Sequence, residues 1–364
     1  MQSAVAIDVE TTTFEKGNPF SPNNRMVTVS LKTDKIHSIY KVEEKTLDIL
    51  RKVLAEYNLF VGFNIKFDLH WLRRYNLLPK DYMIHDTQLH YYIESGQTKT
   101  FPSLNDVAAE FNLPVKPDKI AEYWDRGVDT PDIPWEELQE YALHDTYVTW
   151  EIYKKQEVKP IHKMNFLDLQ VLQEMEWNGM HFDREKALSL AEQNNKLIEE
   201  TTQRLNLHHN LPFFNWGSGD HLSALLFGGS IINVEKEPIG FYKSGERKGQ
   251  VKYKNVDREY KLPRLFKPKG KTATGKFSVD EETLQELEGG ELIDGILKVK
   301  ALKKDTSTYL LGFPKLQDRC NYPKNYIYGN FNQTATATGR LSSNSPNLQN
   351  CSDTILSCFT SRYE

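Results

Sequence analysis

The most constraining feature of this sequence is an apolar strand near its start that carries two carboxylates. The segment AVAIDVET (4–11) alternates, so Asp8 and Glu10 share one face with two alanines while valine and isoleucine form the other face. The two acids then lie about 7 Å apart along a strand that we expect to be buried on both sides. Because like charges repel there unless a cation joins them, the strand predicts a metal site.

Two further segments place acids on inward-facing stripes. In GFNIKFDLHWL, Asp68 follows helical spacing with apolar residues, and on a later helix Asp145 comes one turn after Tyr141. Burying an uncompensated carboxylate costs several kcal/mol, so three segments that each turn acids inward indicate a shared counter-ion. Oxygen-only ligation favours Mg²⁺ or Mn²⁺.

The predicted chemistry is phosphodiester hydrolysis. Two such ions about 3.5–4 Å apart activate a water and stabilise the leaving oxygen. Tyr141 has a phenol that can hold this water. The ordinary pKa of a tyrosine phenol, about 10, argues against loss of the phenol's own proton. Taken singly, each acid has an ordinary explanation: D-x-E is common on strands, Asp68 suits a helix start, and Asp145 suits a solvated helix face. Their order and spacing together favour the site.

The chain changes character along its length. Up to about residue 155 strands alternate with helices, which is typical of α/β folds. A break at 156–165, with Pro160, marks the first expected boundary. Beyond it the pattern is mainly helical, with Asp183 as the cap of a helix to about Leu205 and with an extended loop or β-ribbon over 240–275. The expected strands are 4–9, 27–31, 36–42 and 59–63, and the expected helices are 45–57, 67–75, 104–111, 134–155, 183–205, 220–227, 280–288 and 292–311.

Charge is unevenly distributed. Residues 236–276 hold thirteen Lys or Arg against four Asp or Glu, a local charge of +9. Because the whole chain carries −4, the remainder carries −13, and a basic island lies among acidic domains. We find no export signal and no apolar run near the roughly 20 residues that span a bilayer, and the three cysteines lack metal-ligand spacing. A reducing, cytoplasmic location and no membrane partner are expected.

Three sequence motifs resemble the exonuclease motifs of family A DNA polymerases: IDVET, VGFNIKFDLHWL and YALHDTYVTW. They match the tyrosine-bearing branch of the DEDD exonuclease superfamily, since the histidine branch would have His at Glu140. Across residues 1–155 the resemblance implies a ribonuclease H-like fold and a 3′-5′ exonuclease with two Mg²⁺ or Mn²⁺ ions. It implies a structural or supporting role for Asp86, and we expect His144 to face outward. The implied metal ligands are Asp8, Glu10, Asp68 and Asp145, with Tyr141 and Glu10 positioning the water.

The resemblance continues beyond the exonuclease. LQEMEWNGMHFD (172–183) is similar to the entrance of the polymerase thumb, and KALKKDTSTY (300–309) to its DNA-tracking helix. TATGRLSSNSPNLQN (336–350) resembles the motif that leads into the palm. The alternative for the helix is a solvated basic helix end. The implied DNA contacts, to a single-stranded 3′ end and to a primer-template duplex, are Asn64, Lys300, Lys303, Lys304, Thr306, Ser307, Arg340, Asn347 and Gln349.

We therefore expect an exonuclease domain over 1–158, a helical thumb-like region over 159–318 and an incomplete start of palm over 319–364. Asp353 comes too early to be the family's first polymerising aspartate, so the chain alone is not expected to polymerise. A second polypeptide carrying palm and fingers is the expected partner, as in a split phage-like polymerase. For the basic insertion 236–276, a solvated loop is favoured over a grip on DNA or a processivity factor.

Two alternatives stay open. One is a free-standing nuclease of the RNase D kind that acts on RNA, although TGRLSSNSPNLQN has no reason to exist there. The other is a non-catalytic DNA-binding subunit left by gene decay, although decay has no reason to spare four acids and a tyrosine. Substrate preference and metal-dependent cleavage distinguish them.

Overall fold

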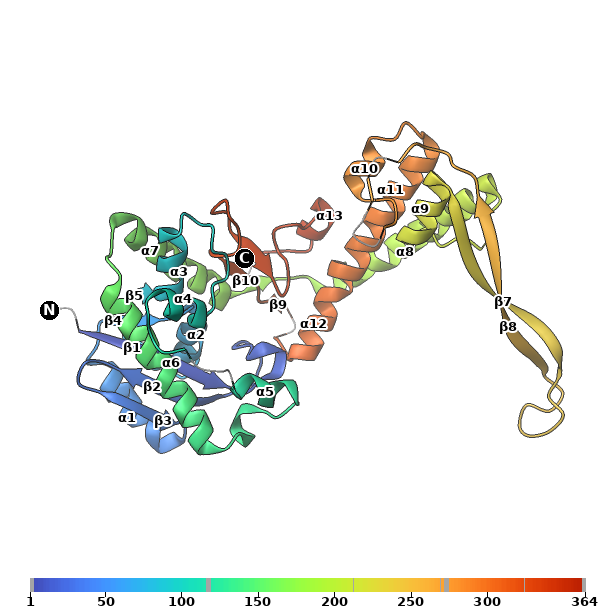
Figure 1. Ribbon diagram of the computed structural model, residues 1–364. Helices are drawn as coiled ribbons and strands as arrows, with labels where there is room; N and C mark the ends of the chain where they lie inside the picture. The colour runs from blue at the N-terminus through green and yellow to red at the C-terminus, as the bar shows by residue number, and fades with distance from the viewer. Residues whose placement is uncertain are drawn as a thin grey trace. The chain divides into compact units, whose positions relative to one another are not determined.

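The computed structural model describes residues 3–115, 119–211, 213–268, 270–271, 275–323 and 325–361 (Figure 1). The chain divides into two compact units. One comprises residues 1–184 and 313–364, and the other comprises residues 185–312. Within the described residues, no helix has both the length and the apolar content needed to cross a bilayer.

The first unit is built on a five-stranded mixed sheet. Its strand order is β3-β2-β1-β4-β5, with β1 antiparallel to β2 and parallel to β4. This confirms the predicted α/β fold, in which helices flank a mixed sheet. The strands are β1 (Ala4–Thr11), β2 (Met26–Lys32), β3 (His37–Lys41), β4 (Leu59–Gly62) and β5 (Met83–Asp86).

Helices cover both faces of this sheet (Figure 1). Apolar residues of β1 pack with helices α1 and α2 on one face, whereas Ala6 packs with Trp150 of α6 on the other. The alternation in AVAIDVET is therefore observed, and Asp8 and Glu10 lie on the α6 side of the strand. The helices are α1 (Glu44–Leu54), α2 (Lys66–Arg74), α3 (Thr87–Glu94), α4 (Leu104–Glu110), α5 (Lys119–Asp125) and α6 (Trp135–Lys155), with 3₁₀ turns η1 (Phe14–Lys16) and η2 (Thr130–Asp132).

The expected break at 156–165 is shorter than predicted. Pro160 begins helix α7 (Pro160–Asn178), a position where proline is well tolerated because the first N–H of a helix needs no partner. Phe166 and Leu169 of α7 join the core of the first unit, so the compact unit continues past residue 158 to Arg184. Packing thus groups the chain differently from the domain boundaries expected from the motifs.

The C-terminal segment also belongs to the first unit. It contains α12 (Gly312–Cys320), β9 (Tyr326–Ile327), β10 (Asn330–Asn332), β11 (Ser342–Asn344) and α13 (Asp353–Leu356). Strand β9 pairs with β6 (Met180–His181), and β10 pairs with β11. The motif TATGRLSS lies against the exonuclease-like part, where Tyr92 donates its hydroxyl to Thr336 O at 2.6 Å.

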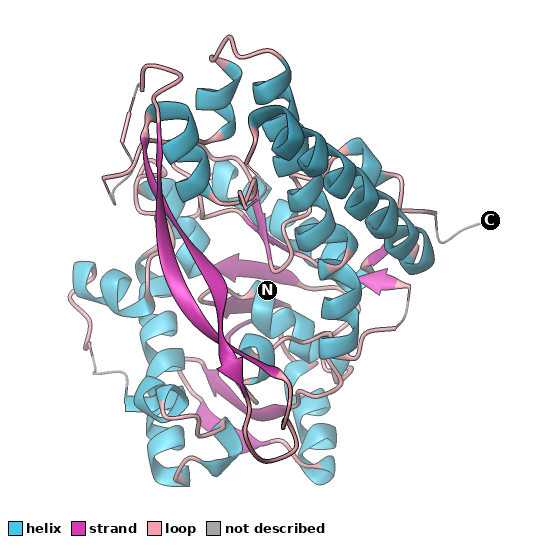
Figure 2. Ribbon diagram, turned by 90° about the vertical axis from the view of Figure 1, so that its right-hand side faces the viewer, coloured by secondary structure: helices cyan, strands magenta, loops and turns pink. Residues whose placement is uncertain are grey.

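The second unit combines helices with one long hairpin. Its helices are α8 (Arg184–His209), α9 (Gly219–Phe227), α10 (Glu281–Gln285) and α11 (Glu291–Lys304). The helix expected over 292–311 widens into a π-helix at η3 (Asp305–Leu310). Most of the basic island lies in a twisted antiparallel ribbon, β7 (Gly229–Phe241) with β8 (Val251–Leu262), as Figure 2 shows. Of the two forms expected over 240–275, an extended loop or a β-ribbon, the ribbon is observed, and it spans 229–262.

Candidate functional site

Strand β1 and helix α6 meet at the two N-terminal acids. Ser30 of β2 pairs with Asp8, and its hydroxyl oxygen lies 3.2 Å from the carbonyls of both Asp8 and Ala142. Because Ala142 lies between Tyr141 and Asp145, this contact holds the turn of α6 that carries them against β1. The long helix and the first strand are therefore fixed beside one another where their functional side chains occur.

Asp68 joins this site from helix α2. The backbone N–H of Val9, between Asp8 and Glu10, donates to Asp68 Oδ1 at 2.9 Å. The Asp68 side chain is buried, and this burial, together with the charge of Asp8, raises its pKa well above the ordinary value. Two carboxylates from distant parts of the chain thus repel one another in a shielded position, which is the arrangement that a cation would relieve.

The remaining acids and the tyrosine are partly shielded. Glu10 is buried, and the Asp145 side chain is 16% exposed. Tyr141 packs edge-on against Trp124, with ring centroids 6.4 Å apart. Asp129, just before α6, accepts from the backbone N–H of Thr13 at 2.8 Å and so fixes the end of β1.

The four acids offer only carboxylate oxygens, which are the ligands that hard divalent ions prefer. The carboxylates of Asp8 and Asp68 repel one another, and a cation would relieve this repulsion. In the part of the chain that the structure describes, no group of three or more His, Cys, Asp or Glu side chains stands in the arrangement of a metal site. The structure therefore brings Asp8 and Asp68 together and places α6 beside them, and ligation by all four acids stays a prediction.

Asp86 has a structural role that shapes the site. Its carboxylate caps α3 by accepting from Leu89 N at 2.9 Å, and it also accepts from Ile65 N at 2.9 Å and Asn64 N at 3.3 Å. It thereby holds the turn that leads into α2 and Asp68. Asn64 in this turn has a left-handed backbone and an exposed side chain.

The structure corrects the expectation for His144. Its side chain is 21% exposed rather than outward-facing, and its Nδ1 lies 3.4 Å from Asp145 Oδ1. Sequence reasoning also missed Ser30 and Asp129. Neither residue carries a motif, and their roles arise from strand pairing and from a contact across 116 residues of sequence.

The predicted DNA-contacting residues differ in solvent exposure and in whether their polar groups are already hydrogen-bonded within the protein. Lys300 donates to Val279 O at 2.6 Å and Thr306 is buried, so both are engaged within the second unit. Lys304 and Ser307 are exposed, although Ser307 donates its hydroxyl to Lys303 O at 2.7 Å, and Lys303 is partly buried. In the C-terminal segment Arg340 and Gln349 are exposed, and partly buried Asn347 accepts from Gln349 N at 3.0 Å.

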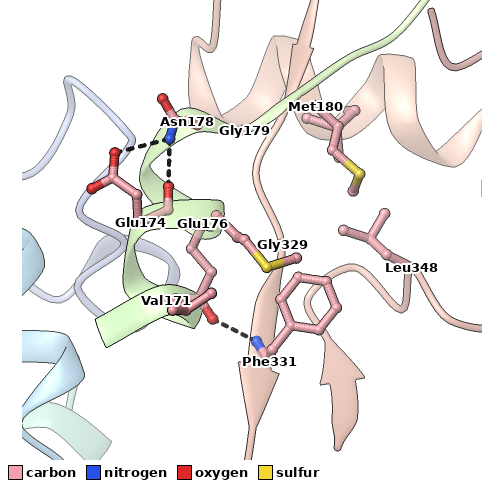
Figure 3. A pocket seen from close by; sticks show the side chains of 11 residues that line it. Val171, Glu174, Glu176, Asn178, Gly179, Met180, Gly329, Phe331 and Leu348 are labelled. Carbon is pink, nitrogen blue, oxygen red and sulfur yellow. Dashed lines mark hydrogen bonds between the residues drawn. The ribbon is translucent and has the colours of Figure 1, made fainter. Parts of the chain in front are cut away.

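A separate pocket of about 340 Å³ lies between α7 and the C-terminal segment of the same unit (Figure 3). Met175, Met180, Phe331 and Leu348 contribute apolar walls, and Glu176 lies at its edge.

Comparison with known proteins agrees with this geometry. Residues 1–159 match the model of the 3′-5′ exonuclease family, and residues 253–361 match DNA polymerase family A. The chain therefore carries a 3′-5′ exonuclease domain and a segment of the DNA polymerase family A domain. The exonuclease match contains all four acids and the tyrosine of the site, and the polymerase match contains the KALKKDTSTY and TATGRLSS motifs.

The chain is also similar to several bacterial enzymes named DNA polymerase I. It is 28% identical to that of Chloroflexus aurantiacus over 261 residues, covering 68% of this chain and 24% of the relative. It is 29% identical to the DNA polymerase I of Synechocystis over 329 residues, covering 85% of this chain and 29% of the relative. It is 25% identical to the DNA polymerase I of Aquifex aeolicus over 328 residues, covering 86% of this chain and 49% of the relative. The chain thus spans between about a quarter and a half of these relatives.

A solved structure shows the same fold. The polymerase domain of Pol1 from M. smegmatis, determined with a DNA primer-template and dNTP, superimposes with a TM-score of 0.63 at 17% identity. The match covers 98% of this chain and 55% of that chain.

Proposed function

We propose that this chain is a metal-dependent 3′-5′ exonuclease that removes nucleotides from DNA ends in association with a family A polymerase. The observation that supports the proposal is the hydrogen bond from Val9 N to the buried Asp68 carboxylate, because Val9 lies between Asp8 and Glu10 in the sequence of β1. A single-strand end is the natural substrate, because a 3′ end that frays at a mismatch enters such a site more readily than a paired one.

In this mechanism Asp8, Glu10, Asp68 and Asp145 would hold two Mg²⁺ or Mn²⁺ ions. Such ions supply an activated water and stabilise the leaving oxygen of the phosphodiester. Glu10 and the Tyr141 phenol would orient that water. The packing of α6 on β1 through Ser30 keeps these groups in register.

The proposed DNA contacts extend beyond the acids. Exposed Asn64, four residues before Asp68 in the sequence, would contact the 3′ end of the DNA. For the duplex, Lys303 and Lys304 suit phosphate oxygens better than Lys300 and Thr306, which are engaged or buried. Exposed Ser307 would exchange its bond to Lys303 O for one to a phosphate. Arg340, Asn347 and Gln349 would meet the primer-template through its minor groove or phosphates.

We also propose a polymerase partner for one apolar surface. Helix α7 exposes Met164, Leu167, Val171 and Met175, which recur every three or four residues and are each more than half exposed. Val171 and Met175 also line the pocket beside Phe331 (Figure 3). An apolar row of this kind marks an interaction surface. A palm and fingers, on this or a second polypeptide, would cover it; a phage origin and a cytoplasmic location remain predictions.

The basic ribbon β7–β8 is the second proposed contact. Its tip carries exposed Lys243, Arg247, Lys248, Lys252 and Lys254 against one acid, Glu246. This charge complements a phosphate backbone, so DNA is favoured over a processivity protein.

The test of the exonuclease proposal is cleavage of a 3′-labelled single-stranded DNA with Mg²⁺ or Mn²⁺. Purified protein should shorten the strand from its 3′ end, and Asp8→Ala with Glu10→Ala should abolish cleavage while the protein still folds. Equal cleavage by the double variant would remove the catalytic assignment. A strong preference for RNA would favour the RNase D alternative, and duplex binding without any metal-dependent cleavage would favour the non-catalytic subunit.

A further inference from the structure

A buried charged cluster lies behind helix α2, away from the acids of the site. The carboxylate of Glu176, on α7, is only 3% exposed. It accepts from Lys66 Nζ, from His70 Nε2 at 2.8 Å and from the backbone N–H of Phe331 at 2.6 Å. Figure 3 shows the last of these bonds at the edge of the pocket. Glu176 therefore joins α2, α7 and β10.

Lys66 completes this cluster. Its buried ammonium also donates to Asn330 Oδ1 at 2.9 Å and to the Phe331 carbonyl. Both charged groups are thus directed at β10, which lies within the DNA polymerase family A match. Buried ion pairs seldom add net stability over apolar residues of the same size, so their main contribution here is to fix direction.

The cluster fixes the orientation of α2 about its own axis. Lys66 and His70 are four residues apart and share one face of the helix, whereas Asp68 lies midway between them in sequence and so points to the opposite side. Holding the first face against Glu176 turns Asp68 toward β1, where it accepts from Val9 N. A small rotation of α2 would move the Asp68 oxygens away from Asp8.

We propose that Glu176 is a positioning residue for the exonuclease. Through Lys66 and His70 it sets the direction in which Asp68 presents its oxygens, and through β10 it ties that direction to the polymerase-family segment. This inference rests on the proposed exonuclease function. Residues that orient metal ligands typically change metal affinity or activity by about 10- to 100-fold when substituted.

The test compares two glutamates that join the same pair of helices. Glu176→Gln keeps the size of the side chain and removes its charge. Glu174→Gln is the matched control, because Glu174 on α7 pairs with Arg73 of α2 at the surface. Mg²⁺ binding to the DNA-free proteins is measured by isothermal titration calorimetry, and single-turnover cleavage of single-stranded DNA is measured across a Mg²⁺ titration. Both are done at a temperature where the variants are folded by circular dichroism.

We expect Glu176→Gln to raise the Mg²⁺ dissociation constant of the DNA-free protein and the Mg²⁺ concentration for half-maximal cleavage, each about tenfold. Glu174→Gln should match the wild type in both quantities. A Glu176→Gln protein whose Mg²⁺ titration superimposes on the wild type overturns the inference. If the wild type itself cleaves nothing, the exonuclease proposal fails instead, so the two failures are distinguishable.

A second variant guards against a purely structural effect. Lys66→Met with Glu176→Met replaces the ion pair by apolar side chains of similar volume, which proteins often tolerate without loss of stability. If Glu176 orients Asp68, this double variant folds and still needs about tenfold more Mg²⁺. Wild-type Mg²⁺ dependence in the folded double variant would show that packing alone positions Asp68, and would overturn the proposal.

Discussion

At the scale of single residues, Asp68 shows how a functional acid acts against the stability of its own fold. Burial and the charge of Asp8 raise its pKa well above the ordinary value of 3.8. The folded protein then binds this proton more tightly than the unfolded chain does. The associated stability is fully present below the unfolded pKa and is lost as the pH rises through the raised folded value. At neutral pH without metal, the ionised Asp68 is therefore a cost.

Replacing Asp68 by Asn tests this cost. The amide oxygen can still accept from Val9 N, but no charge is buried. In EDTA at pH 7 we expect Asp68→Asn to be more stable than the wild type by about 1–2 kcal/mol, and we expect this advantage to shrink as the pH is lowered. Thermal unfolding followed by circular dichroism measures it.

Adding Mg²⁺ should reverse the order of stability. The wild type gains stability by binding the ion, whereas the variant lacks a ligand and gains less. Cleavage should be lost in the variant. Equal pH slopes for the two proteins in EDTA would show that Asp68 is not the buried acid that we describe.

How far sequence reveals such a site depends on the type of interaction. Alternation in AVAIDVET was sufficient to place Asp8 and Glu10, because successive side chains on a strand take opposite faces whatever the fold. The bond from Val9 N to Asp68 spans 59 residues and carries no local signal. His144 was misjudged because its exposure depends on how closely α6 lies on the sheet, which periodicity does not specify.

At the scale of elements, Asp86 connects two helices that sequence reasoning treated separately. It caps α3 and also accepts two backbone N–H groups from the turn before α2. Asp86→Ala leaves these buried donors without a partner, so we expect a loss of about 3 kcal/mol in the free energy of unfolding. Urea denaturation measures it.

Asp106 provides the matched control for this prediction. It lies in the exposed capping box of α4, where it accepts from Ser103 N at 3.1 Å, and water can replace that bond. We expect Asp106→Ala to cost about 1 kcal/mol or less. If both substitutions cost the same, Asp86 acts only as a helix cap and does not hold the turn that leads to Asp68.

The tip of the ribbon β7–β8 is proposed to contact DNA phosphates. If its tip contacts phosphates, changing four tip lysines to Gln should reduce the slope of log affinity against log salt by about 0.9 per lost contact. Affinity for a primer-template duplex at low salt should fall at least about tenfold. Fluorescence anisotropy in EDTA measures binding without cleavage. The lysines are Lys243, Lys248, Lys252 and Lys254.

The control removes the same charge from exposed positions of the other unit, and its lysines are Lys35, Lys45, Lys52 and Lys80. This variant should bind duplex nearly as the wild type does. Both variants should still cleave a short single strand. Unchanged duplex binding by the ribbon variant would exclude the DNA contact and leave a protein partner for the ribbon.

Helices and strands were predicted best where the apolar residues follow a single helical or strand periodicity. Strands β1, β2 and β4 and helices α2, α4 and α6 lie within about two residues of their expected ranges. Strand β5 and helix α3 were not expected, because Asp86 interrupts a short apolar run and β5 has only four residues. Helix α7 was not expected, because Pro160 indicated a break in the pattern, although proline also begins helices.

At the scale of the whole molecule, the first unit is assembled from two separate stretches of chain. Its largest core draws only on residues before 185, from Val5 to Leu169. Arg184, where the chain leaves this unit, donates to Pro314 O at 3.1 Å and to Asp318 Oδ1 at 2.9 Å, just after the chain returns. The two ends are therefore adjacent, and the second unit is an insertion between them.

Excising residues 185–312 and joining the ends by a short Gly-Ser linker should leave a folded exonuclease. We expect a single cooperative unfolding transition and single-strand cleavage within a few-fold of the intact chain, because the acids, their supports and the Glu176 cluster all lie in the retained unit. Duplex affinity should fall at least about tenfold, since the basic ribbon and the Lys304 helix are removed together. If single-strand cleavage is lost while the shortened protein still folds, the second unit contributes to the exonuclease site itself, and the division of work between the two units is wrong.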